Sequence, residues 1–126
     1  MVEIFVTRES GVAVVDFAAK EVLDMAKAAT VGRHLSDLVE RGDLGNVLID
    51  FRNVKLMTST MINELLQVRK KCADHRVHLK FCSLSHELTD LFKKLKLDKT
   101  FEIYGSRGQA LKAFQPAKRA DAPKNR

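Results

Sequence analysis

The chain has 126 residues, of which 45% are hydrophobic and 6% aromatic, with no tryptophan and a net charge of +6. This length predicts one domain with a single core, and the few aromatic side chains argue against a stacking platform for single-stranded nucleic acid. The sequence contains neither a leader-like segment nor an apolar run of about 18 residues, so we expect a soluble, cytoplasmic protein without membrane insertion.

The N-terminal third predicts a β-hairpin followed by a helix. The aliphatic residues Val2, Ile4 and Val6 alternate with Glu3, Phe5 and Thr7, and a more buried apolar run follows at residues 12–17 after a glycine-containing turn. Apolar side chains then recur at helical spacing over residues 20–41, with an interruption that residues 30–33 could cause. Gly42 stands at the C-cap position, where it is expected to end this helix.

The middle of the chain predicts a buried strand and an amphipathic helix. Residues 46–51 are almost continuously apolar, as parallel strands covered by helices on both faces require. We therefore expect this strand at the centre of the sheet. A helix is predicted over residues 59–73, because one of its faces collects the less polar side chains. This stripe comprises Ile62, Leu65, Leu66, Arg69 and Cys72.

The C-terminal part predicts two further strand–helix units. Residues 77–82 form the first strand, and Ser85 is expected to cap the helix that follows it. The apolar residues of this helix follow the i, i+3, i+4, i+7 spacing, namely Leu88, Leu91, Phe92 and Leu95. A last strand is expected over residues 99–104 and a closing helix over residues 109–114. Residues 105–108 are interpreted as a β-to-α turn rather than a nucleic-acid clamp, because a strand precedes them.

This order of elements predicts an α/β domain over residues 1–114. Strands separated by single helices require a largely parallel sheet, and the N-terminal hairpin makes it mixed. We expect four to five strands and four to five helices. Residues 115–126 contain both prolines, four basic residues and one acidic residue, and are expected to form a flexible basic tail.

Three successive hydroxyl side chains, Thr58, Ser59 and Thr60, stand at the start of the predicted central helix. The first N–H groups of a helix lack intrahelical partners and carry the positive end of the helix dipole. A hydroxyl can cap these groups, and a phosphate is stabilised beside them. The triplet therefore has two interpretations, a helix cap or a phosphorylation switch.

Asp50 ends the central strand, where open α/β sheets place their ligands. We expect it to shape the following loop electrostatically and to face Ser59 across that loop, with capping of the loop or helix as the alternative. A single carboxylate does not predict enzymatic activity.

No catalytic or metal-binding grouping emerges from the sequence. It contains no phosphate-binding glycine loop and no Gly-x-Ser-x-Gly motif. Cys72 and Cys82 lack a paired spacing and stand among apolar neighbours, so buried, reduced thiols are expected. The histidines show no ligand spacing; they are His34, His75, His78 and His86. We therefore expect no metal, no cofactor and no enzymatic activity, and nucleic acid is not the expected partner.

Six segments, taken in serial order, resemble a STAS domain, the domain of the bacterial anti-sigma factor antagonists. They are residues 47–51, 58–60, 65–66, 79–84, 97–104 and 110–111. The resemblance covers about residues 3–114 and implies the mixed, mostly parallel STAS fold. In this family the helix start typically reads Asp-Ser-Ser/Thr-Gly, and a partner kinase phosphorylates its first serine.

On this resemblance Ser59 occupies the phosphoacceptor position, with Thr58 as the alternative acceptor. Thr58 replaces the family's aspartate, and Met61 replaces its glycine and is expected to add bulk where a kinase approaches. The implied mechanism is partner switching: the unmodified domain, a monomer or weak dimer, binds an anti-sigma factor that is also a serine kinase, and phosphate reverses binding. The expected partner-binding residues are Asp50, Thr58, Ser59, Thr60, Asn63 and Glu64.

The resemblance also implies an alternative without a switch. STAS-like domains serve as stressosome components and as soluble accessory subunits of lipid-handling ABC transporters. The departures at Thr58 and Met61 from the family's phosphorylation motif favour such a scaffold role.

Overall fold

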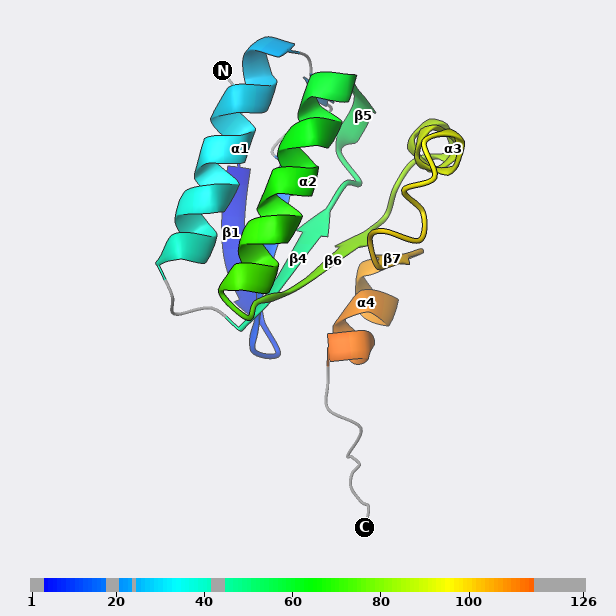
Figure 1. Ribbon diagram of the computed structural model, residues 1–126. Helices are drawn as coiled ribbons and strands as arrows, with labels where there is room; N and C mark the ends of the chain where they lie inside the picture. The colour runs from blue at the N-terminus through cyan, green and yellow to red at the C-terminus, as the bar shows by residue number, and fades with distance from the viewer. Residues whose placement is uncertain (1–3, 18–20, 24, 42–44, 115–126) are drawn as a thin grey trace.

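The computed structural model describes residues 4–17, 21–23, 25–41 and 45–114 (Figure 1). In chain order the elements are β1 (Ile4–Glu9), β2 (Val12–Phe17), β3 (Glu21–Leu23), α1 (Met25–Glu40), β4 (Asn46–Asp50), β5 (Val54–Met57), α2 (Ser59–Asp74), β6 (His78–Cys82), α3 (His86–Lys94), β7 (Ile103–Tyr104) and α4 (Arg107–Phe114).

The main sheet confirms the predicted α/β architecture. Its five strands lie in the order β1-β2-β4-β6-β7. The hairpin strands β1 and β2 are antiparallel, and every later neighbour pairs in parallel. The apolar strand β4 lies in the middle, between β2 and β6, as its hydrophobicity predicted.

Two short strands that the sequence did not predict form a second sheet, in which β3 and β5 pair in parallel. β3 lies within the stretch expected to be helical, so α1 begins at Met25 rather than at residue 20. From there α1 runs without a break through residues 30–33. A three-residue strand is stabilised by its distant partner, which local periodicity does not reveal. The expected C-cap Gly42 lies outside the described residues.

The C-terminal elements follow the prediction with two changes of boundary. Ser85 caps α3 as expected, with its hydroxyl accepting a hydrogen bond from the Leu88 N–H at 3.1 Å. The last strand is only Ile103–Tyr104, because residues 98–100 form a turn. Residues 105–106 form the expected turn, and α4 begins at Arg107, two residues before the predicted start.

Helices cover both faces of the main sheet. α1 and α2 lie side by side on one face, and α4 lies on the other (Figure 1). Because side chains of a strand alternate between faces, Val47 and Ile49 belong to the larger core under α1 and α2, whereas Leu48 belongs to the smaller core under α4. Cys72 and Cys82 are free and buried, and burial raises the pKa of each thiol to about 11.

Phenylalanine rings fill the larger core where the sheet meets α3. Phe81 has no exposed surface, and its ring centroid lies 4.9 Å from that of Phe51 and 4.6 Å from that of Phe101. These contacts join β6 to the segments that follow β4 and precede β7. Phe81 therefore contributes strongly to the packing of the sheet's central region.

The substitution Phe81→Ala should lower the free energy of unfolding by about 3–5 kcal/mol, since it removes a buried ring and leaves a cavity. Phe5→Ala is the matched control, because Phe5 is 53% exposed and its removal should change stability by no more than about 0.5 kcal/mol. Urea unfolding followed by circular dichroism measures both. Similar losses for the two variants would contradict this account of the core.

Candidate functional site

The site is the junction between β5 and α2. Thr58 is the N-cap residue, with extended backbone angles of φ −89° and ψ 168°, and its carbonyl accepts a hydrogen bond from the Ile62 N–H at 3.1 Å. The Thr58 side chain makes no capping hydrogen bond to the helix. The cap interpretation therefore holds for the backbone of Thr58 and not for its hydroxyl.

The hydroxyl triplet divides between surface and interior. Ser59, the first residue of α2, is exposed, whereas Thr58 and Thr60 are half-buried. Asn63, one helical turn after Ser59, is also exposed. Ser59 and Asn63 thus share one outward face of α2.

Met61 points into the molecule. It has no exposed surface and belongs to the buried face of α2 with Leu65, one turn later. The expectation that Met61 adds bulk where a kinase approaches is therefore wrong. A helical residue two positions after Ser59 faces roughly the opposite side, which here is the core.

Leu56 adds an apolar component that the sequence did not single out. It is 47% exposed, whereas the next residue, Met57, is only 7% exposed. Side chains alternate along the extended chain, so Leu56 and Thr58 project to the same side, away from Met57. We call Leu56, Thr58, Ser59, Thr60 and Asn63 the docking surface.

Glu64 is held against the neighbouring helix. It is half-buried, and a Cβ placed on Gly32 of α1 would lie only 2.1 Å from its Oε1 atom. The absence of a side chain at Gly32 makes room for Glu64. This carboxylate consequently packs between α1 and α2 rather than extending from the docking surface.

Asp50 is 1% exposed, so its carboxylate does not reach a partner directly. Its Oδ1 atom accepts a hydrogen bond from the Arg52 backbone N–H at 2.9 Å, and its Oδ2 atom accepts one from Arg107 Nε at 2.9 Å. The first bond stabilises the turn after β4, which leads through β5 to the docking surface. Asp50 therefore shapes this loop from inside, and direct partner contact by Asp50 is not compatible with its burial.

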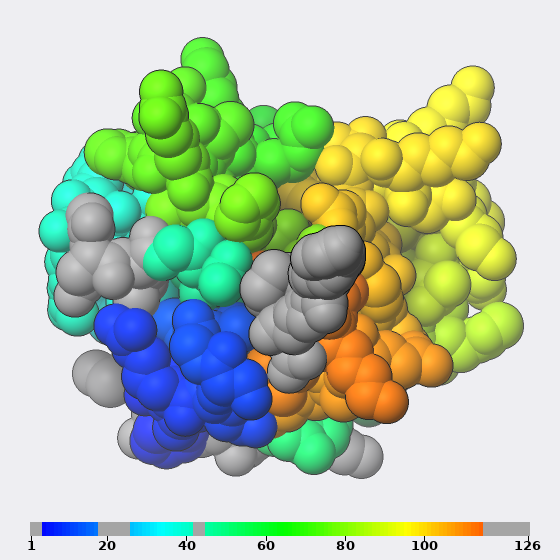
Figure 2. All heavy atoms as spheres, turned by 90° about the horizontal axis from the view of Figure 1, so that it is seen from below, coloured from blue at the N-terminus to red at the C-terminus, as the bar shows by residue number. Residues whose placement is uncertain are grey.

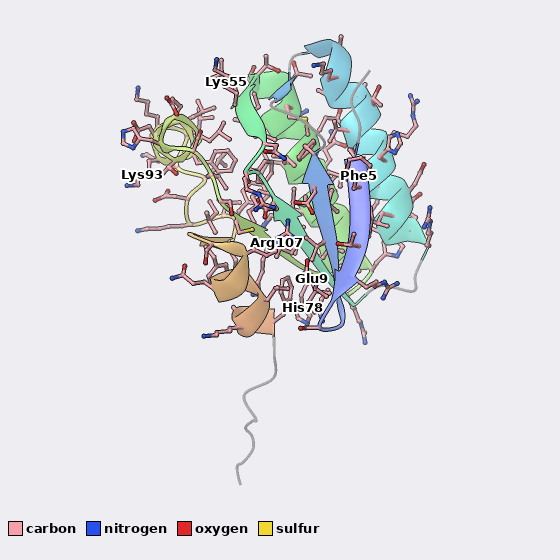
Figure 3. The ribbon with its side chains drawn as sticks, turned by 180° about the vertical axis from the view of Figure 1, so that it is seen from behind. Phe5, Glu9, Lys55, His78, Lys93 and Arg107 are labelled. Carbon is pink, nitrogen blue, oxygen red and sulfur yellow. The ribbon has the colours of Figure 1, made fainter. Side chains whose placement is uncertain are left out.

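Arg107 connects the loop to the rest of the sheet. Besides Asp50, its guanidinium binds Glu9 of β1 at 2.8 Å and Asp16 of β2. Figure 3 shows Arg107 at the start of α4 and Glu9 at the end of β1, and Figure 2 shows the hairpin and α4 meeting on one surface of the molecule. One side chain thus ties α4 to three strands.

The charges of this network perturb one another. Burial raises the pKa of Asp16 and outweighs the lowering effect of Arg107. Burial alone would lower the pKa of Arg107, but the hydrogen bond to Asp50 and the charge of Asp16 raise it. Arg107 is therefore a permanent cation, while ionisation of Asp16 is disfavoured by its surroundings.

The STAS domain family model matches residues 4–110 of the chain. The chain belongs to the STAS domain family. Comparison with curated protein sequences gave no match. Within this STAS domain, Ser59 stands at the junction that the sequence resemblance assigned to the family's phosphoacceptor.

Solved structures show the same fold. A STAS domain protein of the anti-sigma factor antagonist type from Planctomyces limnophilus is 23% identical, with a TM-score of 0.79 over 87% of this chain and 96% of its own. An anti-sigma factor antagonist from Mycobacterium paratuberculosis is 21% identical, with a TM-score of 0.79 over 90% and 93%. The Bacillus cell fate determinant SpoIIAA in its phosphorylated form is 11% identical, with a TM-score of 0.68 over 91% and 100%.

Two further properties concern the described part of the STAS domain. None of its helices combines the length and apolar character that a membrane span requires. Its described residues contain no group of three or more histidine, cysteine, aspartate or glutamate side chains arranged to hold a metal ion. The three carboxylates at Arg107 already share a guanidinium as their counter-charge.

The raised pKa of Asp16 gives a prediction with a defined sign. The folded STAS domain holds a proton on Asp16 to higher pH than the unfolded chain does, so this residue's contribution to stability decreases as the pH rises above the ordinary pKa of an aspartate. Asp16→Asn cannot ionise, and its stability relative to the natural chain should increase between about pH 4 and pH 7.

Urea unfolding at several pH values tests this prediction. Asp98→Asn, at an exposed acid outside the network, is the control and should show no such trend. A relative stability of Asp16→Asn that falls over the same range would show that the ion pair with Arg107 outweighs burial.

Proposed function

We propose that this STAS domain is an anti-sigma factor antagonist that binds an anti-sigma factor with serine kinase activity through the docking surface. The observation that carries the proposal is the exposed hydroxyl of Ser59 at the first position of a helix of 16 residues. Proteins of the same fold bear the name of anti-sigma factor antagonist, and one of them was solved in a phosphorylated form. In this proposal the protein acts in the bacterial cytoplasm, where its binding to the anti-sigma factor regulates transcription.

Phosphate on Ser59 would act as an electrostatic switch. It would add a charge of about −1.5 to −2 to a surface that is otherwise uncharged. The N-terminal N–H groups of α2 favour a negative group there, and the first turn of the helix contains no acidic residue to oppose it. The modified domain therefore keeps its fold, while a partner that fits the neutral surface loses affinity by desolvation and repulsion.

Burial favours Ser59 over Thr58 as the phosphoacceptor. A kinase has to bring the hydroxyl oxygen into its own active site, which requires an accessible side chain. Ser59 is exposed, whereas Thr58 is half-buried and forms the bend between β5 and α2. We therefore assign phosphorylation to Ser59 and keep Thr58 as the alternative acceptor.

The remaining candidate residues take different parts in the proposed docking. Asn63 offers an exposed amide one turn from Ser59, and Leu56 offers apolar area. Asp50 supports the docking surface through the loop, and Glu64 supports it through the packing of α2 on α1. Their substitution should affect binding indirectly, through the position of α2.

A scaffold without a switch is the second candidate. It is favoured by Thr58, which takes the place of the acidic residue that precedes the phosphoacceptor in the resembled motif. Such a protein would bind its partner in the same way whether or not position 59 carries a charge.

The test is reconstitution with a purified anti-sigma factor that has serine kinase activity, taken from the organism that encodes this chain. Incubation with ATP followed by mass spectrometry should find phosphate on Ser59. Calorimetry should show that Ser59→Glu weakens binding to that kinase by about tenfold or more, since the new carboxylate must be desolvated at the interface. Ser59→Ala should bind as the natural chain does and accept no phosphate.

Gln67→Glu is the matched control. Gln67 is exposed on α2, two turns beyond Ser59 and outside the docking surface, so this variant gains the same charge at a different place. Its affinity should change by less than about threefold. Undiminished binding by Ser59→Glu would favour the scaffold, and absence of both complex and phosphate would remove the proposal.

A further inference from the structure

β1 lies at one edge of the main sheet and exposes apolar side chains. Its inner side pairs with β2, and no strand in the described part of the chain pairs with its outer side. Phe5 is 53% exposed and Val6 46% exposed. The strand contains neither proline nor lysine, which protect many natural edges from pairing. Alternate residues of β1 thus present backbone N–H and C=O groups to a strand that could be added.

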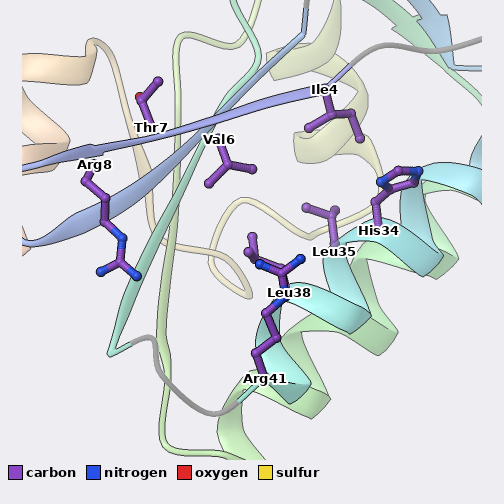
Figure 4. A pocket seen from close by; sticks show the side chains of 8 residues that line it. All are labelled: Ile4, Val6, Thr7, Arg8, His34, Leu35, Leu38 and Arg41. Atoms are coloured by element: carbon purple, nitrogen blue, oxygen red, sulfur yellow. The ribbon is translucent and has the colours of Figure 1, made fainter.

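A groove of about 370 Å³ runs between β1 and α1. Figure 4 shows Ile4 and Val6 extending from β1 toward Leu35 and Leu38 of α1. A strand added to β1 would lie about 4.8 Å outside it, and alternate side chains of that strand would point toward this groove. We call this feature the β1–α1 groove.

The ionisable side chains that line the groove are two arginines and a histidine. Arg8 lies at one end, His34 lies beside Ile4 at the other, and Arg41 follows Leu38 along α1 (Figure 4). No acidic side chain lines the groove, and none of the three basic side chains forms an ion pair with a described residue. The groove is therefore apolar in the middle, with arginine side chains at Arg8 and Arg41 and an imidazole at His34.

We propose that the β1–α1 groove binds an extended segment of a partner protein that adds a strand to β1. The segment would place apolar side chains over Leu35 and Leu38 and carboxylates near His34, Arg8 and Arg41. Strand addition supplies main-chain hydrogen bonds, and the side chains over the groove supply specificity. The charges of the groove select an acidic segment.

A second copy of this chain fits the groove less well than an acidic partner does. A second copy added antiparallel to β1 would set the arginine end of each groove beside the histidine end of the other, so neither copy would bring a carboxylate to the arginines of its partner. An acidic segment brings that complementary charge. The groove also shares no residue with the docking surface, so both surfaces can be tested independently.

The probe is a capped seven-residue peptide with glutamate at both ends, valine at the third and fifth positions, and threonine at the others. All four glutamate and valine side chains then lie on one face of the strand, in either direction of pairing. Added to the full-length chain labelled with ¹⁵N, it should shift the amide signals of residues 4–9 and 34–41. The amide signals of residues 56–63 should not move.

Matched charge reversals test the groove. Arg41→Glu should weaken peptide binding by about tenfold or more, since it replaces attraction by repulsion. Arg33→Glu makes the same change at an exposed residue of α1 outside the groove, and its affinity should stay within about twofold. Equal effects of the two variants would overturn the proposal, because only the net charge would then matter.

Backbone methylation tests the added strand. Only alternate N–H groups of the peptide can face β1, so N-methylation of one alternate set should abolish binding while methylation of the other set leaves it. Equal effects of both sets would overturn strand pairing. Absence of amide shifts at peptide concentrations up to millimolar would also overturn the proposal. So would amide shifts of the groove residues with oleate but not with the peptide, because the groove would then bind a lipid instead of a strand.

Discussion

The ion pair between Arg107 and the buried carboxylate of Asp50 fixes the point at which the chain leaves the central strand. A carboxylate with 1% exposure is costly to bury unless it is paired and hydrogen-bonded. Arg107 provides the charge, and the Arg52 N–H provides a further hydrogen bond. The loop after β4 therefore has a defined path, and this path determines where β5 and the start of α2 lie.

The same guanidinium determines how the helices are distributed over the sheet. Arg107 is the first residue of α4 and also binds Glu9 and Asp16 on the hairpin. This brings the amino end of α4 to the face that α1 and α2 leave open, where its Ala110 closes a small core over Leu48 and Cys82. The network thus links the N-terminal hairpin to the last helix across a sequence separation of 98 residues.

Packing of α2 decides which side chains can take part in recognition. Met61 and Leu65 fill the core beneath the helix, so Ser59 and Asn63 are left on the outer side. Glu64, between these two faces, fills the space that Gly32 leaves on α1. The docking surface is consequently small and uncharged, and a single phosphate would alter it greatly.

The proposed surfaces differ in the chemistry they offer. The docking surface presents hydroxyls, an amide and Leu56 beside the start of a helix. The β1–α1 groove combines an apolar floor with arginine side chains along a sheet edge. Since the chain as a whole has a net charge of +6, both surfaces lie on a protein whose long-range field attracts acidic partners.

The sequence determined the elements that depend on local patterns. Alternation in the hairpin, the apolar run of β4, the periodicity of α2 and the serine before α3 all predicted what the structure contains, because backbone geometry repeats at fixed intervals. They were sufficient for the mixed, largely parallel sheet and for the serial order of the STAS family. They also placed Ser59 at a helix start.

Only the tertiary structure decided the features that depend on distant contacts. β3 forms because β5 lies beside it, and Asp50 is buried because Arg107, 57 residues later, neutralises it. The exposure of Leu56 and the inward direction of Met61 follow from how β5 and α2 dock. The physical reason is common to all four: pairing, burial and ionisation are set by neighbours in space, which a local pattern along the chain does not specify.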